Sequence, residues 1–346
     1  MATIYYLIPD LHKKEFKLKD WLKSVLSGHG IAYIKNKVFR KHKPVGGIKV
    51  MYQHCMMLQE LGYEAYPLIM GDYVGNFFGY DIELKYIKDV GYNLTEEDVI
   101  VATEFFPYEG VDFIGAKKVL FMQNWINIDK RLKKEDVNKS YIDIGYDYVM
   151  TCGSFCSEMV NKKMGIDATT ITNGIDQQKF INKPEKRIPG RVLAMSRKNL
   201  ADLEQITELV KRDKSDFDLK IVDGLTQAEL IKEYQKADVF LVTGYPEGLP
   251  LPPLEAMNCG CVVIGFTGGG ASEYMIHNET ALVSEDGDCP DAAKHVKAIL
   301  SDDKLKERLR AAGIIKAKSY TLANTQKMLG DFFQILQIKA NNNGNK

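Results

Sequence analysis

The stretch that decides the fold is residues 242–274, VTGYPEGLPLPPLEAMNCGCVVIGFTGGGASEY. It follows an apolar segment, crosses a loop rich in glycine and proline, and reaches two prolines that suit the first turn of a helix. The helix is expected to stop at Gly260, and a second apolar segment and a second glycine loop follow. This order predicts a parallel α/β unit with a helix N-terminus beyond the carboxyl edge of its sheet, where such sheets bind phosphates.

Short apolar segments alternate with helical patterns along the rest of the chain. Strands are expected at residues 3–8, 64–70, 98–103, 117–122, 147–151, 168–172, 191–196, 219–222, 238–243 and 261–265, and helices at 48–61, 200–210, 227–235, 291–300 and 322–338. Continuously apolar strands indicate parallel sheets covered on both faces. Ten strands over 346 residues favour two doubly wound halves, with one closed barrel as the alternative.

A polar segment at residues 171–190 predicts the boundary between the two halves, because it contains Asn-Gly, two prolines and a charge run. We therefore expect a first Rossmann-like domain at 1–170 and a second at 171–321. A C-terminal helix at 322–340 is expected to pack back on the first domain, and residues 341–346 are expected to be a disordered tail.

Composition excludes several classes of protein. A chain with 45% hydrophobic and 27% charged residues is not a disordered one, and no apolar window is long enough for a membrane span. The N-terminus lacks the charge order of a secretory signal, and the six cysteines lack zinc-site or disulfide-scaffold spacing. The sequence therefore predicts a cytoplasmic protein, and its net charge of zero argues against nucleic-acid binding.

One basic segment interrupts this balance. Residues 10–44 contain ten lysines and arginines against three acidic residues, and we expect them to form an insertion. Within it, residues 15–26 place five apolar side chains at helical spacing, with Trp21 among them and lysines around the other face. Packing of this helix on the first domain is favoured, and peripheral contact with an anionic membrane is the open alternative.

Two carboxylates beside an anion site suggest a carbohydrate ligand. Glu247 lies in the loop and Glu255 in the first helical turn. Both would repel phosphate, whereas each carboxylate can accept two hydrogen bonds from a sugar diol. Helix capping and simple surface exposure are an equally weighted alternative. The later loop at 265–270 has the wrong position for a dinucleotide site, so NAD is not expected.

The segment Glu247-Gly-Leu-Pro-Leu-Pro-Pro-Leu-Glu255 resembles the Glu-x7-Glu signature of family 4 retaining glycosyltransferases. Four further motifs occur in the family's order: Val45-Gly46-Gly47-Ile48, Ile171-Thr172-Asn173-Gly174, Ser196-Arg197-Lys198-Asn199 and Ala237-Asp238-Val239-Phe240. The resemblance covers most of the chain and implies the GT-B fold, in which two Rossmann-like domains face each other across a cleft. It also implies that the first domain binds the acceptor and the second binds the nucleotide sugar.

The resemblance implies a role for each matching residue. Glu247 would bind hydroxyls of the donor sugar, Glu255 the ribose diol, and Arg197 the diphosphate as charge develops on it. Gln123 or Asn124 would position the donor sugar, where many members of the family carry a histidine, and an amide that only caps the end of the strand is an equally weighted alternative. Further donor-binding residues are expected to be Lys198, Gly248, Leu249, Leu251, Gly46, Gly47, Asp223 and Leu225.

Three positions depart from the family pattern. Pro250 stands where the family usually has glycine, so one backbone donor is absent. The family's second diphosphate cation would fall at Asp202 or Leu203, and Lys198 is the candidate substitute. The missing histidine leaves an amide, which cannot shuttle a proton at neutral pH.

The resemblance therefore implies a transferase in glycan or cell-surface polysaccharide biosynthesis. It would move a hexose-type sugar from a nucleotide sugar to a saccharide or lipid-linked acceptor, with retention at the anomeric carbon. No cofactor and no metal are expected, and Asp286-Gly-Asp288 is expected to be a surface turn. The alternative function is a non-catalytic nucleotide-sugar or carbohydrate-binding protein on the same fold.

Overall fold

A computed structural model describes residues 2–9, 21, 25, 46–71 and 80–338 of the chain. Most of the basic segment at 10–44 therefore lies outside the described residues. Of its expected helix only Trp21 and Val25 are described, and both are helical. The predicted tail at 341–346 also lies outside the described part.

The strands form two open parallel sheets, so the closed barrel is excluded. The first has the order β3-β2-β1-β4-β5-β6-β7, which is doubly wound with its switch point between β1 and β4. Its strands are β1 (Thr3–Ile8), β2 (Glu64–Ile69), β3 (Lys85–Tyr86), β4 (Val99–Thr103), β5 (Lys117–Met122), β6 (Tyr148–Thr151) and β7 (Thr169–Thr170).

The second sheet has the order β12-β11-β10-β8-β9, and its switch point lies between β8 and β10. Its strands are β8 (Val192–Met195), β9 (Leu219–Val222), β10 (Val239–Val242), β11 (Val262–Phe266) and β12 (Ala281–Ser284). Every residue of β10 and β11 is buried, as expected for parallel strands covered on both faces.

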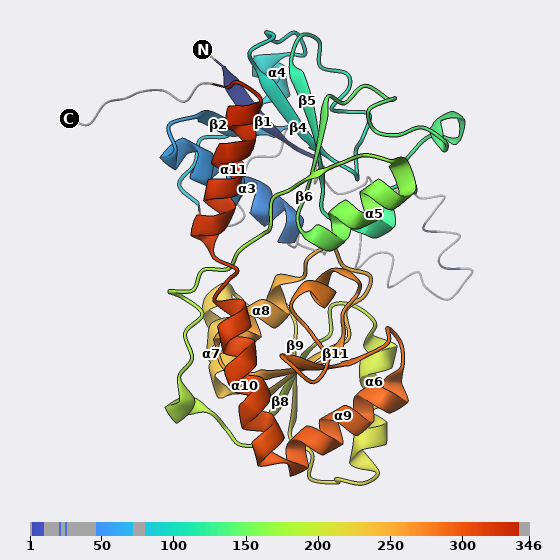
Figure 1. Ribbon diagram of the computed structural model, residues 1–346, viewed down its shortest axis with the longest axis vertical. Coiled ribbons are helices and arrows are strands. Elements are labelled where there is room, and N and C mark those ends of the chain that lie inside the picture. The colour runs from blue at the N-terminus through green and yellow to red at the C-terminus, as the bar shows by residue number, and fades with distance from the viewer. Residues whose placement is uncertain (1, 10–20, 22–24, 26–45, 72–79, 339–346) are drawn as a thin grey trace, which may run out of the picture. The chain divides into compact units, whose positions relative to one another are not determined.

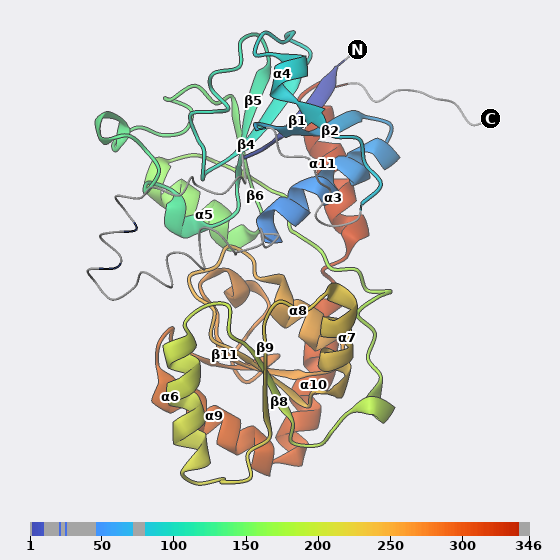
Figure 2. The ribbon, with the colours of Figure 1, turned by 180° about the vertical axis from the view of Figure 1, so that it is seen from behind.

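Helices connect the strands, as the pattern predicted. They are α3 (Gly46–Glu60), α4 (Ile87–Val90), α5 (Ser154–Met164), α6 (Leu200–Lys211), α7 (Gln227–Lys236), α8 (Leu251–Asn258), α9 (Cys289–Ser301), α10 (Asp303–Ala317) and α11 (Leu322–Ile335), with short 3-10 turns η2 (Trp125–Asn127), η3 (Lys134–Asp136), η4 (Pro184–Lys186) and η5 (Gly270–Glu273). Helix α3 packs on β1 and β2, whereas α8 and α10 pack together beside β11 (Figures 1 and 2).

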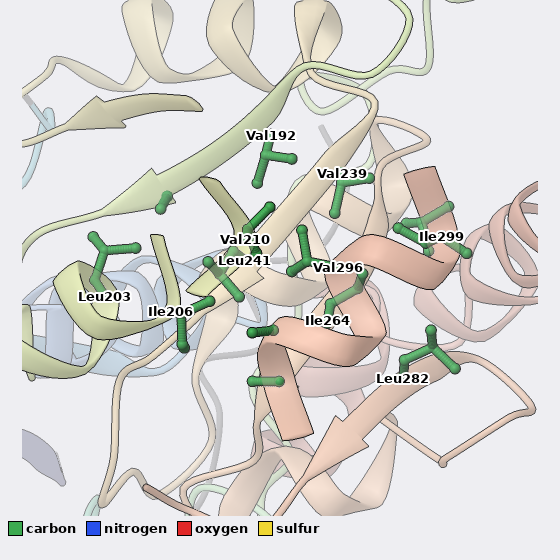
Figure 3. Packing of buried hydrophobic residues seen from close by; sticks show 14 of the residues in the cluster. Val192, Leu203, Ile206, Val210, Val239, Leu241, Ile264, Leu282, Val296 and Ile299 are labelled. Carbon is green, nitrogen blue, oxygen red and sulfur yellow. The ribbon is translucent and has the colours of Figure 1, made fainter. Parts of the chain in front are cut away.

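The core of the second sheet lies between its strands and the helix pair α6 and α9. Figure 3 shows Leu203 and Ile206 of α6 and Val296 of α9 directed toward Leu241 and Ile264. All five side chains are at most 1% exposed. Burial of each such side chain contributes about 1.5–3 kcal/mol, so this packing fixes the carboxyl ends of β8 and β10.

The sequence predicted most of these elements. All ten expected strands are present, and the expected helices at 48–61, 200–210, 227–235, 291–300 and 322–338 correspond to α3, α6, α7, α9 and α11. The two-residue strand β3, strand β12 and helices α4, α5 and α10 were not predicted. Within the described residues, none of the helices combines the length and apolar composition that crossing a membrane requires.

Chain contacts divide the molecule into two compact units. The first contains Met1–Ala102, Tyr108–Val119 and Gln337–Lys346, and the second contains Thr103–Pro107 and Leu120–Leu336. The site described below lies within the second unit.

Candidate functional site

A pocket lies at the switch point of the second sheet, where parallel sheets of this kind bind ligands. Its empty volume is about 450 Å³, part of it open to solvent. It is bounded by the carboxyl ends of β8 and β10, by the loop that follows β10 and by the start of α8. The lining residues are Met195, Arg197, Lys198, Phe240, Leu241, Val242, Thr243, Gly244, Glu247, Pro250, Pro252 and Pro253.

Three predicted site residues meet at this pocket. The Glu247 Oε1 atom lies 2.7 Å from Lys198 Nζ and 3.3 Å from Arg197 Nη2. The Glu247 side chain is 15% exposed, whereas that of Arg197 is 57% exposed. Lys198 and Arg197 are adjacent in sequence and both reach the same carboxylate, directly before Asn199, whose φ is 50°. The pocket therefore combines two cations that could neutralise a diphosphate with a carboxylate that could accept hydroxyl hydrogen bonds.

The backbone of Glu247 is held by the second glycine loop. Its N–H donates to the carbonyl oxygen of Gly268 at 2.8 Å, and its own carbonyl accepts from the N–H of Gly270 at 3.2 Å. Gly268 adopts a φ of +61°, a region that favours glycine. The loop is fixed in turn by Asp286, whose Oδ1 atom accepts from the N–H of Gly268 at 3.0 Å. The glycine run 268–270 thus supports the Glu247 loop.

Gln123 and Asn124 follow β5 and contact the same loop. Asn124 Oδ1 accepts from the N–H of Ile126 at 3.2 Å, which caps the short turn η2. Its Nδ2 donates to the carbonyl oxygen of Pro246 at 3.3 Å. The Asn124 amide therefore links two backbone segments. The side chain of Gln123 is half-buried, and within the described residues no hydrogen bond of its amide is recorded.

The residues between the two glutamates show how close this packing is. A Cβ atom added to Gly248 would overlap the carbonyl oxygen of Gln123 and would lie 3.1 Å from Cys152 Sγ. Leu249 is buried, and Leu251 is the first residue of α8. Pro250 forms the N-cap, so the cap and the first three helical residues contain a single backbone N–H, that of Leu251.

Glu255 lies apart from the pocket lining. It is 7% exposed, and its Oε2 atom accepts from the Tyr234 hydroxyl at 3.4 Å. Burial of Tyr234, and after it the charge of the Glu255 carboxylate, raise the pKa of Tyr234 well above its usual range. Glu247 thus lines the pocket, whereas Glu255 is buried against Tyr234 and is not among the lining residues.

The other predicted donor-binding residues have different positions. Asp223 and Leu225 are exposed in the loop after the edge strand β9 and do not line the pocket. Gly46 and Gly47 open helix α3 in the first unit. At Asp202, where the family's second cation was expected, the carboxylate accepts from the Tyr245 hydroxyl at 2.8 Å and raises the pKa of Tyr245 to about 12.

Two carboxylates, fully buried Glu104 and half-buried Glu273, were missed by the sequence reasoning. Glu104 follows β4, is fully buried and has its pKa raised to about 7, chiefly by burial. Glu273 in η5 accepts from the N–H of Phe155 at 3.1 Å in the first turn of α5, and burial raises its pKa. A glutamate directly after an apolar strand was the available signal for Glu104, because that edge of a parallel sheet carries functional groups.

The aspartates of the Asp286-Gly-Asp288 turn have separate structural contacts. Asp286 holds Gly268, and Asp288 caps α9 by accepting from the N–H of Asp291 at 3.0 Å. Across the described parts of the chain, no group of three or more His, Cys, Asp or Glu side chains is arranged to hold a metal ion.

Similarity to known proteins centres on this region. The family described as Glycosyl transferases group 1 matches residues 200–316. The D-inositol 3-phosphate glycosyltransferase of Corynebacterium diphtheriae is 26% identical over 129 residues, which are 37% of this chain and 30% of the relative. O-antigen chain mannosyltransferase B of Escherichia coli is 26% identical over 129 residues, which are 37% of this chain and 33% of the relative. The match spans about a third of the length of these curated relatives.

Solved structures resemble the whole chain. Sucrose-phosphate synthase from Thermosynechococcus elongatus has a TM-score of 0.69 at 14% identity, with 97% of this chain and 99% of that chain covered. HepE of Anabaena, in complex with UDP and glucose, has a TM-score of 0.71 at 12% identity, with 96% and 100% covered. At such identities the likeness shows the fold. The chain therefore has the GT-B fold of two parallel-sheet α/β domains, and its residues 200–316 match the group 1 glycosyl transferases.

Proposed function

We propose that this protein is a retaining glycosyltransferase that moves a hexose-type sugar from a nucleotide sugar to a saccharide or lipid-linked acceptor. The observation that carries the proposal is the cluster of Glu247, Lys198 and Arg197 at a switch-point pocket. A donor with a diphosphate and a sugar diol presents both the charges and the hydroxyls that such a cluster can bind.

The cluster suggests how the donor binds. Lys198 and Arg197 turn from Glu247 to the diphosphate, and the freed carboxylate accepts hydroxyl hydrogen bonds from the sugar. Arg197 is exposed enough to move, and its planar guanidinium matches phosphate oxygens. Glu255 binds the ribose diol in this proposal, which requires its carboxylate to exchange the long contact with Tyr234 for the nucleotide.

The chemical step needs no protein nucleophile. The bond between C1 and the diphosphate oxygen breaks, and the acceptor oxygen bonds to C1 on the same face. The acceptor proton passes to a phosphate oxygen of the departing nucleotide. Lys198 and Arg197 stabilise the charge that develops on that leaving group, and preorganised charge of this kind is usually the largest catalytic contribution. The reaction is proposed to be independent of metal.

Relatives support this class of substrate. One is named a mannosyltransferase of O-antigen chains, and HepE was solved with UDP and glucose. These names favour a nucleoside diphosphate hexose as donor and a polysaccharide or glycolipid as acceptor. We propose that the protein acts in the cytoplasm, where nucleotide sugars are the available donors.

Two measurements test the proposal. A thermal-shift screen across UDP, GDP, dTDP and ADP sugars should find one donor that stabilises the protein, by about 2.7 kcal/mol at a hundredfold excess over Kd. With that donor, release of free nucleotide should be detected and should persist in EDTA. Loss of turnover in EDTA with recovery in Mn²⁺ or Mg²⁺ would contradict the metal-free role of Lys198 and Arg197.

A binding protein without catalysis is the second candidate, and Pro250 is the observation that favours it. With Pro250, Pro252 and Pro253 the start of α8 has one backbone N–H, so fewer donors can face a phosphate than in a helix without prolines. Stabilisation by a donor sugar with no nucleotide release, even when saccharide acceptors are supplied, would establish this alternative.

A further inference from the structure

Glu104 is a buried carboxylate for which the proposed chemistry has no direct use. It follows β4 at the switch point of the first sheet and is 0% exposed. Its two oxygens accept from consecutive backbone donors: Oε2 from the N–H of Gln123 at 3.0 Å and Oε1 from the N–H of Asn124 at 2.9 Å. Both donors come directly after β5, so this carboxylate fixes the point at which the chain leaves the sheet.

The segment that Glu104 fixes holds the peptide group between Pro246 and Glu247 from two flanks, directly at its carbonyl and through Gly268 at its N–H. On one flank, Asn124 Nδ2 donates to the carbonyl oxygen of Pro246, the residue before Glu247. On the other, Trp125 Nε1 donates at 3.1 Å to the carbonyl oxygen of Gly268, which also accepts from the N–H of Glu247. Two successive residues therefore hold the peptide group that joins Pro246 to the candidate sugar-binding residue Glu247, Asn124 directly at its carbonyl and Trp125 through Gly268 at its N–H.

Close packing leaves this linkage little freedom. A Cβ at Gly248 would overlap the Gln123 carbonyl oxygen, and a Cβ at Gly269 would lie 2.5 Å from the Phe155 ring and 2.8 Å from Trp125 Nε1. A shift of segment 123–125 must therefore displace the loop, because packed interiors transmit strain.

We propose that Glu104 is a positioning residue for Glu247, acting through its hold on residues 123–125. The inference rests on the proposed transferase function. An ionised carboxylate accepts strongly from both N–H groups, whereas in a protonated one the hydroxyl oxygen is a weaker acceptor and its O–H needs an acceptor of its own, so one of these bonds is weakened. The placement of Glu247 should therefore depend on the protonation of Glu104.

The surroundings of Glu104 put this change within the physiological range. Burial raises the pKa of Glu104 to about 7, and hydrogen bonds from Gln123, Asn124 and Asn127 oppose that rise. Cys152 is the titratable neighbour that responds to Glu104. Its hydrogen bond to Cys156 and its burial raise the pKa of the Cys152 thiol well above its usual range, so it stays neutral here. At pH 6 about a tenth of Glu104 would be ionised.

The test is the pH profile of kcat for nucleotide release at saturating donor. Between pH 6 and pH 8.5 the wild-type value should rise about tenfold with a midpoint near pH 7. Glu104→Gln should give a flat profile at about a tenth of the wild-type plateau or less, because misplacement of a reacting group by an ångström can cost on the order of 10²-fold. A Glu104→Gln profile that follows the wild type would overturn the proposal.

Asp98→Asn is the matched control. Asp98 precedes the same strand β4 at its other end and accepts from the N–H groups of Thr3 at 2.8 Å and Thr95 at 2.9 Å. Among the described residues its carboxylate is hydrogen-bonded to Thr3 and Thr95 and not to segment 123–125, so its variant should keep the pH dependence of kcat. If Asp98→Asn also flattens the profile, general destabilisation explains both variants and the proposal is wrong.

Two further tests do not use the Glu104 variant, and the first, fluorescence, is also independent of turnover. The chain has two tryptophans, so in a Trp21→Phe background the fluorescence reports on Trp125 alone. Its emission should titrate near pH 7, and Asn124→Ser, which can still cap Ile126 but cannot reach Pro246, should lower kcat about tenfold. Absence of the titration, or wild-type kcat in Asn124→Ser, would refute the proposal. Absence of nucleotide release in the wild type would instead refute the transferase function.

Discussion

Glu247→Gln should change catalysis and nucleotide binding in opposite directions. In the free protein the Glu247 carboxylate pairs with Lys198 at 2.7 Å and Arg197 at 3.3 Å. The substitution keeps the shape of the side chain and removes its charge. It therefore weakens hydrogen bonds to the donor sugar and also releases two cations that the diphosphate needs.

The magnitudes follow from exposure and hydrogen bonding. Arg197 is 57% and Lys198 33% exposed, so solvent screens both pairs, and together they are worth about 1 kcal/mol. Their release should tighten binding of free nucleoside diphosphate by up to about fivefold. Each charge-assisted bond to a sugar hydroxyl is worth about 1.5–3 kcal/mol. Because these bonds orient C1, kcat should fall on the order of 10²-fold.

The assay pairs kcat for nucleotide release with calorimetric affinity for the free nucleoside diphosphate. Glu255→Gln should behave in the opposite way, weakening nucleotide binding through the ribose while reducing kcat less. Glu208→Gln on the exposed face of α6 is the control that should change neither quantity. A tenfold loss of nucleotide affinity in Glu247→Gln would refute the assignment of Lys198 and Arg197 to the diphosphate. Unchanged kcat would refute the role of Glu247.

Four further outcomes are expected. Gly248→Ala should lower the free energy of unfolding in urea by about 1–3 kcal/mol and reduce kcat, because its added Cβ would overlap the Gln123 carbonyl oxygen. In Gly46→Ala no atom of the described residues would lie within 4 Å of the added Cβ, so this variant should keep or raise the free energy of unfolding. Asp238→Asn should cost about 3–5 kcal/mol, because it removes the buried carboxylate that lies 2.5 Å from Arg310 and leaves that cation its exposed partner Glu307. Burial opposes ionisation of Asp238, but hydrogen bonds from the Gly190 N–H and from Arg310 outweigh it and lower the pKa of Asp238, so this stabilisation should be present above pH 4 and be lost on acidification. The contribution of Glu104 to stability has the opposite dependence on pH. Its pKa rises on folding from 4.5 to about 7, so the free energy of unfolding should fall by up to about 3 kcal/mol as the pH rises from 4.5 to 7. Glu104→Gln should remove this pH dependence. If residues 15–26 bind a membrane, vesicle binding should require anionic lipid and weaken with salt, at about 1 kcal/mol per basic residue; equal binding to neutral vesicles would contradict it.

The sequence alone determined the parallel α/β architecture. Apolar runs such as 239–242 and 262–266 carry no alternation, so they fit strands buried on both faces and little else. The sequence did not predict those elements in which the apolar pattern is short or weak. Strand β3 has two residues, and α10 has charged residues spread around much of its surface.

The sequence also located the candidate chemistry. Arg197, Lys198 and Glu247 were expected near a donor from their motifs, and the structure places all three at one pocket. This was possible because the carboxyl ends of neighbouring parallel strands meet at one edge, so residues after β8 and β10 converge whatever the length of chain between them.

Only the tertiary structure decided the surroundings of these residues. No motif indicates that Glu255 is 7% exposed against Tyr234, that Asn124 donates to Pro246, or that Glu104 is fully buried. Burial and hydrogen bonding depend on which distant segments pack together, and a pKa responds to that packing rather than to neighbours in sequence. Periodicity and spacing thus predicted where the strands end and which residues follow them, whereas contacts between segments about 20 to more than 100 residues apart in the chain decided what each of those residues can do.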